Sequence, residues 1–123
     1  MTQPTIDPSR DGFSVVVERN DDVGLMRITG ELDLATHEAV LDAIRDPAVG
    51  GVTQWAIDCS DLTFVDSGGL RALLSIAGQA GGLEHIALYD AQPQLLKLLE
   101  AAGLSEAFTI RTNVATEPPS VTP

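Results

Sequence analysis

Short runs of apolar, mostly β-branched residues alternate along this chain with longer segments that repeat leucine or alanine every three or four residues. A short apolar run bounded by turn residues is typical of a buried strand, whereas the longer repeat is typical of a helix with one apolar face. Strands that alternate with helices favour parallel crossovers, in which the helices cover a sheet. The alternation therefore predicts an α/β fold, with a mixed, mostly parallel β-sheet packed with α-helices.

The expected order of elements is β-β-α-β-α-β-α-β. The first two strands, at residues 13–19 and 23–29, are separated only by a short polar turn and should be antiparallel. The motif Gly30-Glu31-Leu32-Asp33 breaks the strand pattern, and residues 60–67 are expected to form a connecting loop. The remaining strands are expected at residues 53–59, 85–89 and 108–111, and the helices at residues 36–45, 68–80 and 93–102.

Each predicted helix has one apolar face that would pack on the sheet. Glycine or proline follows each of these segments, as is typical of a helix end. The inward-facing residues are expected to be Val40, Leu41 and Ile44 in the first helix, Leu70, Leu73, Leu74 and Ala77 in the second, and Leu95, Leu98, Leu99 and Ala102 in the third.

The two ends of the chain lack these patterns. Residues 1–12 are polar with two prolines and are expected to form a flexible N-terminal arm, and residues 112–123 hold three prolines and are expected to form a disordered tail. Residues 13–111 are then expected to form one domain. The chain shows no secretion signal and no apolar stretch near the roughly 18 residues of a membrane span. A cytoplasmic protein is expected.

The composition is strongly acidic, with 18 Asp and Glu against 7 Lys and Arg and a formal net charge of −11. Nucleic acids and anionic membrane surfaces need clustered basic residues, so neither is expected as a partner. The acidity can serve solubility alone, or it can steer a basic partner surface toward the protein. Both interpretations stay open.

The candidate functional site lies where two predicted strands end. In a parallel sheet, binding groups gather at the carboxyl ends of the strands, where helices begin. The motif Glu31-Leu32-Asp33 follows one strand, and Asp66-Ser67-Gly68-Gly69 begins the second helix. If their strands are parallel neighbours, the two motifs lie at the same edge. Either Asp66 or Ser67 is simply a helix cap, or Ser67 presents a hydroxyl on a turn whose positive helix end tolerates a phosphate.

The chain carries no other clear signal of an enzyme. Asp-Ser-Gly-Gly also surrounds the nucleophile of trypsin-like proteases, but those need two β-barrels and a histidine beside the serine. His37 and His85 begin a helix and a strand, and neither has a reason to meet Ser67. Phosphate-binding glycine motifs and metal-ligand spacings are missing. Catalytic residues, metals and cofactors are therefore not predicted. Cys59 is expected to be a core thiol, with a redox thiol as the alternative.

Together, the two motifs resemble a known family. Gly30-Glu31-Leu32-Asp33, followed by the segment from Asp61 to Leu70 (DLTFVDSGGL), is similar to the STAS domain of bacterial anti-sigma-factor antagonists. The resemblance extends over about residues 13–111 and implies the family's α/β fold. Two positions depart from the family pattern, since Gly68 stands where a Ser or Thr is common and Arg71 replaces a glycine.

The resemblance implies a function in partner switching. The unmodified antagonist of this family binds an anti-sigma factor, which is also a serine kinase, and so releases a sigma factor for transcription. Phosphorylation by that kinase ends the complex, and a serine phosphatase restores it. The phosphorylated position matches Ser67, and the implied partner-binding residues are Asp33, Asp66, Ser67, Gly68 and Gly69. The alternatives are a STAS module in another signalling or lipid-transport assembly, with Ser67 purely structural, and a hydrolase that uses Ser67.

Overall fold

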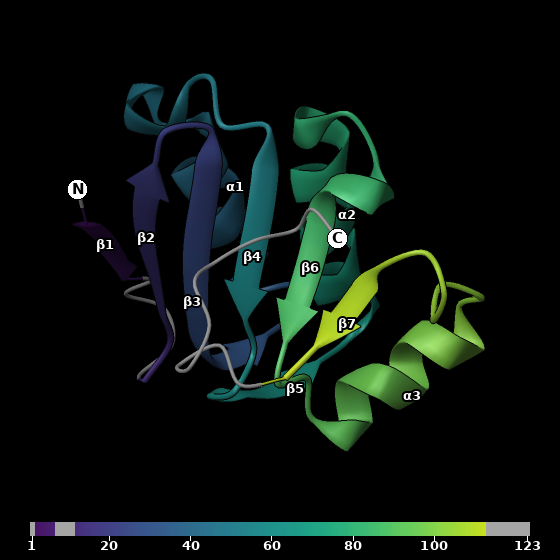
Figure 1. Cartoon of the computed structure of the whole chain (residues 1–123). Helices are drawn as coiled ribbons and strands as arrows, with labels where there is room; N and C mark the ends of the chain where they lie inside the picture. The colour runs from purple at the N-terminus through teal and green to yellow at the C-terminus, as the bar shows by residue number, and fades with distance from the viewer. Residues whose placement is uncertain (1, 7–11, 113–123) are drawn as a thin grey trace.

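The computed structural model describes residues 2–6 and 12–112, with residues 2–6 described by their backbone alone. One sheet holds all the strands in the order β1-β2-β3-β4-β6-β7, with β5 paired to β3 beyond the end of β4 (Figure 1). The strands are β1 (Thr2–Ile6), β2 (Ser14–Asn20), β3 (Val23–Leu32), β4 (Gln54–Asp58), β5 (Leu62–Val65), β6 (Ile86–Tyr89) and β7 (Thr109–Arg111). The helices are α1 (His37–Arg45), α2 (Ser67–Ala80) and α3 (Pro93–Ala101), with short 3-10 turns at Pro47–Val49 and Leu83–His85.

The strand directions confirm the predicted mixed sheet. β2 is antiparallel to both of its neighbours, β1 and β3, whereas β3, β4, β6 and β7 form parallel pairs. Each parallel pair is connected through a helix, as crossover connections require. The α/β class and the positions of the three helices are therefore as predicted from the sequence.

Three segments differ from the prediction. The structure places β1 inside the expected N-terminal arm, where its backbone pairs with β2 from Thr2↔Glu18 to Ile6↔Ser14. β3 continues through Gly30 to Leu32, and residues 62–65 of the expected loop form β5. Pairing between these two segments explains both differences, because each supplies the backbone partners of the other. Of the expected disordered tail, residues 113–123 lie outside the described residues.

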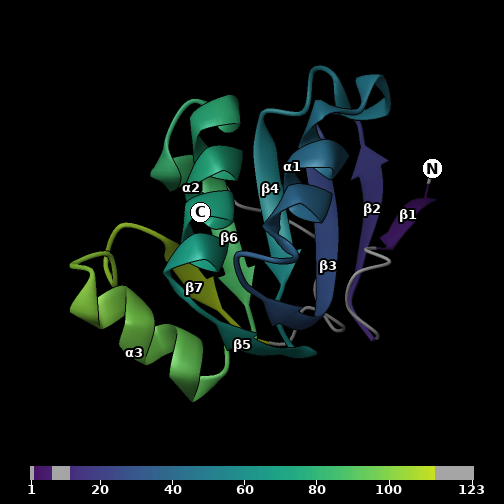
Figure 2. The same cartoon turned by 180° about the vertical axis from the view of Figure 1, so that it is seen from behind.

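Helices α1 and α2 cover one face of the sheet, and α3 lies at the end where β5 and β7 are found (Figure 2). The core between helices and sheet is mainly aliphatic, with Trp55, Phe13 and Phe108 as its aromatic members. In α2 the predicted inward face is right for Leu73, which is fully buried, and wrong for Leu74, which is 36% exposed. Ile76 takes that place in the core. Leu41 and Leu98 are only partly buried, and Ala102 is exposed.

No helix within residues 2–6 and 12–112 has both the length and the apolar character that crossing a membrane requires.

Candidate functional site

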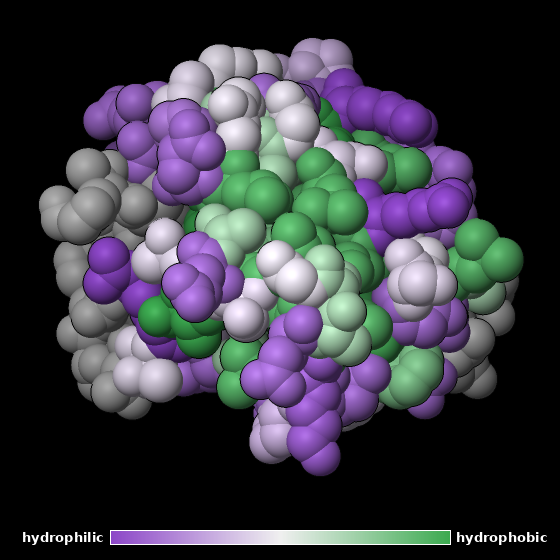
Figure 3. Space-filling model, turned by 90° about the vertical axis from the view of Figure 1, so that its right-hand side faces the viewer, coloured by the Kyte–Doolittle hydropathy of each residue, from purple (hydrophilic) through white to green (hydrophobic). Residues whose placement is uncertain are grey.

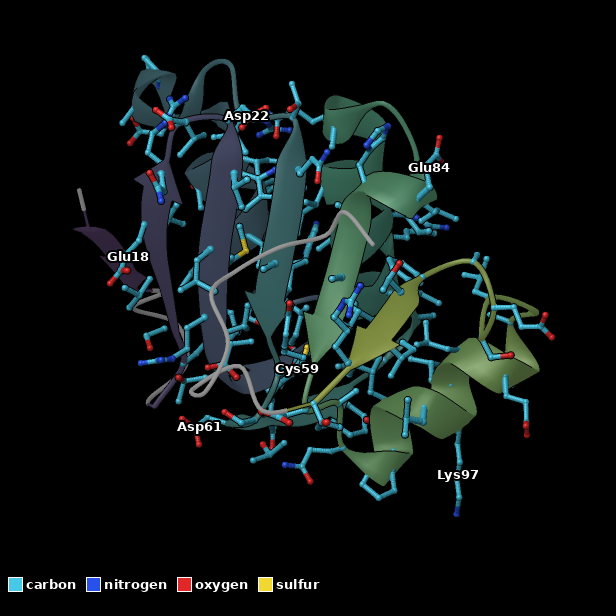
Figure 4. All side chains as sticks on the ribbon, in the orientation of Figure 1. Glu18, Asp22, Cys59, Asp61, Glu84 and Lys97 are labelled. Atoms are coloured by element: carbon cyan, nitrogen blue, oxygen red, sulfur yellow. The ribbon has the colours of Figure 1, made fainter. Side chains whose placement is uncertain are left out.

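The two motifs singled out in the sequence end neighbouring parallel strands. Leu32 of β3 pairs with Val65 of β5, so Asp33 and Asp66 each follow their strand at the same edge of the sheet. Figure 4 places Asp61 at this edge, and its carbonyl oxygen accepts a hydrogen bond from the amide of Gly30 (3.0 Å). The structure therefore brings the two predicted segments together.

A shallow, open depression of about 380 Å³ lies between the two segments. Its lining residues are Asp33, Leu34, Ala35 and Asp66. Leu34 is 72% exposed, an unusual position for a large apolar side chain beside two carboxylates. Leu34 gave no signal in the sequence, because an apolar residue next to a strand is ordinarily part of the core.

Asp33 organises the turn that leads into α1. Its Oδ1 accepts hydrogen bonds from the amides of Ala35 (3.0 Å) and Thr36 (3.1 Å). The buried hydroxyl of Thr36 accepts from the amide of Asp33 (2.9 Å) and donates to the carbonyl oxygen of Glu31 (2.7 Å). Such local bonds fix a turn in place of a longer helix. Asp33 is thus a structural residue as well as one that lines the depression.

Asp66, and not Ser67, caps α2. The Oδ1 atom of Asp66 accepts a hydrogen bond from the amide of Gly69 (2.9 Å), as expected of an N-cap residue. Ser67 is the first residue of the helix and is exposed. Within the part of the chain that the structure describes, its hydroxyl makes no hydrogen bond. This geometry excludes the interpretation of Ser67 as the cap.

Gly68 and Gly69 allow the first turn of α2 to lie against the end of β3. A Cβ atom on Gly68 would lie 3.2 Å from the backbone of Leu34, tighter than an ordinary contact. A Cβ atom on Gly69 would overlap the carbonyl group of Leu32. Gly68, where the chain departs from the family pattern, is therefore a position against which the backbone of Leu34 packs closely.

Exposed apolar residues are not confined to this edge. On the side of the molecule that carries β7 and α3, hydrophobic side chains gather in the middle of the face (Figure 3). Ile110 of β7 and Leu96 of α3 are 40% and 39% exposed. Exposure alone therefore does not distinguish the Ser67 turn. What distinguishes the turn is that the hydroxyl of Ser67 does not serve as the helix cap and follows Asp66, which lines the depression with Asp33 and the exposed Leu34.

His85 and Cys59 lie outside this arrangement, whereas the ring of His37 contacts it through the backbone of Leu34. Nδ1 of His37 is 2.7 Å from the carbonyl oxygen of Leu34, and the nearest charged partner of His85 is Glu84 at 3.8 Å. Cys59 is fully buried in the core, and burial raises the pKa of its thiol, which favours the core interpretation over the redox one. Within residues 12–112, no three His, Cys, Asp or Glu side chains gather in a way that could hold a metal ion.

The sequence is also similar to known proteins. Residues 15–112 match the family model described as "Mlab, STAS domain". The anti-sigma-F factor antagonist RsfB of Mycobacterium tuberculosis is 32% identical over 100 residues, covering 81% of this chain and 82% of RsfB.

Solved structures show the same fold. An anti-sigma factor antagonist from Mycobacterium paratuberculosis superposes with a TM-score of 0.70 at 25% identity, over 85% of this chain and 90% of that one. The antagonist SpoIIAA in its unphosphorylated form gives a TM-score of 0.61 at 20% identity, over 78% and 86% of the two chains. This chain belongs to the STAS-domain family, which includes anti-sigma factor antagonists.

Proposed function

We propose that this protein is an anti-sigma factor antagonist that binds an anti-sigma factor through the Ser67 turn and is released when Ser67 is phosphorylated. The observation that carries the proposal is the exposed hydroxyl of Ser67. This hydroxyl is not needed to cap α2, because Asp66 is the N-cap residue. A hydroxyl in this position can reach both a partner surface and the active site of a kinase.

The surroundings of Ser67 suit a surface that meets a protein partner. The exposed Leu34 offers an apolar contact, while Asp33 and Asp66 line the same depression. Interfaces commonly combine an apolar centre with a polar rim. The net charge of −11 would also steer a basic partner surface toward the protein.

Phosphorylation at this turn would act on the partner more than on the fold. The N-terminus of a helix carries partial positive charge, so α2 tolerates a phosphate on its first residue. The same phosphate brings about −1.5 to −2 charges to the centre of the proposed interface. An anti-sigma factor with serine-kinase activity would supply the phosphate, and a serine phosphatase would remove it. Because sigma factors act on RNA polymerase inside the cell, the proposal places the pair in the cytoplasm.

The proposal excludes catalysis by Ser67 itself. A hydrolase needs a base hydrogen-bonded to its nucleophile, and among the described residues the hydroxyl of Ser67 makes no hydrogen bond to a histidine or a carboxylate. A fluorophosphonate probe labels activated serines, so it should leave this protein unlabelled. Labelling of Ser67 would point to the hydrolase alternative.

The direct test uses the purified protein, its anti-sigma factor and ATP. Mass spectrometry should find one phosphate, on Ser67, and size-exclusion chromatography should show that the complex separates as the phosphate appears. The Ser67→Ala variant should form the complex and keep it in the presence of ATP. A protein that binds no anti-sigma factor would instead be a STAS module of another assembly.

A further inference from the structure

The backbone immediately before Ser67 is held by a residue from a different part of the chain. Val65, the last residue of β5, lies opposite Leu32 of β3, and the amide of the next residue, Asp66, donates to the carbonyl oxygen of Leu32. The other side of Val65 faces α3, which lies beside β5 in both views of the fold (Figures 1 and 2). There the side chain of Gln94, in the first turn of α3, forms hydrogen bonds with both the amide and the carbonyl group of Val65.

The two hydrogen bonds are short and complementary. The amide of Val65 donates to Oε1 of Gln94 at 2.9 Å, and Nε2 of Gln94 donates to the carbonyl oxygen of Val65 at 2.7 Å. In a parallel sheet, a neighbouring strand offers the same donor and acceptor to one residue. The side-chain amide of Gln94 therefore replaces a strand at the open edge of β5. Val65 is almost fully buried, so without Gln94 these backbone groups would have to find other partners.

We infer that Gln94 is a positioning residue for the Ser67 turn, so that α3 sets how Ser67 is presented to a partner or kinase. Val65 is followed directly by Asp66, the cap of α2, and then by Ser67. The amide of Asp66 bonds only weakly to the carbonyl oxygen of Leu32, at 3.3 Å. The firm attachment of the segment is thus one residue earlier, at Val65, where Gln94 holds it. This inference rests on the proposed function for its consequence, but the geometry can be tested without a partner.

Gln92, at the N-cap position of α3, provides a matched control. Nε2 of Gln92 donates to the carbonyl oxygen of Ser60 at 2.9 Å, in the loop between β4 and β5. It therefore makes a single bond to a loop that does not lead directly into Ser67. Gln92→Leu removes an amide from the same end of the same helix and leaves the bonds of Val65 in place.

Amide hydrogen exchange measured by NMR tests the geometry. In Gln94→Leu, the amide of Val65 should exchange at least about tenfold faster than in the wild type, and the resonances of Ser67 and Gly69 should shift. In Gln92→Leu these observables should stay within about twofold of the wild type. Unchanged exchange at Val65 in Gln94→Leu, with the fold intact by circular dichroism, would overturn the inference.

The Gln94→Glu variant gives a signature that simple loss of packing does not. A charged glutamate still accepts from the amide of Val65, but it cannot donate to the carbonyl oxygen. Protonation restores the donor, so the resonances of Val65 and Ser67 should return toward their wild-type positions as the pH falls below about 5. Gln92→Glu should show no such return. A Gln94→Glu spectrum that is independent of pH would contradict the inference.

Partner binding separates this inference from the proposed function. Gln94→Leu should weaken binding to the anti-sigma factor about five- to tenfold, with little change for Gln92→Leu. If the resonances of Ser67 move but binding is unchanged in Gln94→Leu and also in Ser67→Glu, the positioning is correct and the proposed function is wrong. If Ser67→Glu weakens binding and Gln94→Leu does not, the proposed function stands and the inference fails.

Discussion

Gly69 lies directly against the carbonyl group of Leu32. A Cβ atom at Gly69 would be 2.8 Å from the carbonyl carbon of Leu32 and closer still to its oxygen. This contact joins the first turn of α2 to the end of β3, and so joins the Ser67 turn to the Asp33 turn. The two halves of the candidate site are therefore held together through a position that accommodates only glycine.

The first prediction compares two glycines of α2. Gly69→Ala should destabilise the protein by about 1–3 kcal/mol, because the new methyl group forces the helix away from Leu32. Gly78 is exposed in the same helix, and nothing lies within 4 Å of its Cβ position. Gly78→Ala should therefore stabilise the protein by about 0.5–1 kcal/mol, through helix propensity alone. Urea unfolding measures both, and a Gly69→Ala variant as stable as the wild type would show that the close packing at Gly69 is absent.

The second prediction concerns the register of α2. Leu73 is fully buried and its neighbour Leu74 is 36% exposed. Leu73→Ala should lower the free energy of unfolding by about 2–5 kcal/mol, a large part of the stability of a domain of this size. Leu74→Ala should cost less than about 1 kcal/mol. Thermal unfolding of the two variants checks this, and equal losses would contradict the observed register.

The helices and the central strands could be predicted from the sequence because their signals are local. A repeat of apolar residues every three or four positions depends only on which side of the helix faces the sheet. The predicted inward face of α2 was wrong at Leu74, since Leu74 and Ile76 are both apolar and only the tertiary packing selects Ile76.

β1 and β5 could not be predicted in this way, because each depends on a partner strand. β5 has only four residues, and the two in its middle, Thr63 and Phe64, are both exposed. Its buried and exposed positions therefore do not alternate. For the site, the motifs indicated Asp33, Asp66 and Ser67, but Leu34 and Gln94 gave no signal. Their proposed roles rest on contacts between segments that are distant in sequence.

The third prediction concerns how the contribution of Asp58 to stability changes at low pH. Asp58 is buried, and burial alone would raise the pKa of its carboxyl group, but hydrogen bonds from Ser60 and Arg27 outweigh burial and hold the pKa below its usual range. A carboxyl group whose pKa is lowered by folding stabilises the protein above its unfolded pKa, and this contribution is lost as the pH falls through the lowered value. The wild type should therefore be more stable than Asp58→Asn at pH 7, and the difference should shrink below about pH 4. Urea unfolding across this range measures it, and a constant difference would contradict the assignment.

The fourth prediction concerns Cys59, which lies in the core at the end of β4. Thiol reagents attack the thiolate, and burial both covers the sulfur and raises the pKa of this thiol. An aromatic disulfide reagent at neutral pH should therefore modify Cys59 only as fast as the protein unfolds, and rapidly in concentrated urea. Fast modification of the native protein would revive the interpretation of Cys59 as a redox thiol.

The last prediction is the effect of charge at Ser67. Ser67→Ala removes the phosphate acceptor but keeps a small neutral side chain, so it should bind the anti-sigma factor as tightly as the wild type. Ser67→Glu places a negative charge at the proposed interface and should weaken binding about 100-fold, equivalent to about 2.8 kcal/mol. The same charge lies at the positive end of α2, so the fold should be unchanged or slightly more stable.

Ser75 supplies the matched control for this experiment. It is another exposed serine of α2, two helical turns beyond Ser67, and its hydroxyl donates to the carbonyl oxygen of Arg71 at 3.0 Å. Ser75→Glu adds the same charge to the same helix away from the depression, so it should reduce binding by less than about threefold. Titration calorimetry of the four proteins against the anti-sigma factor separates a local effect from one of net charge. Equal losses in Ser67→Glu and Ser75→Glu would mean that only total charge matters, and equal affinities for all four would leave Ser67 without a role in binding.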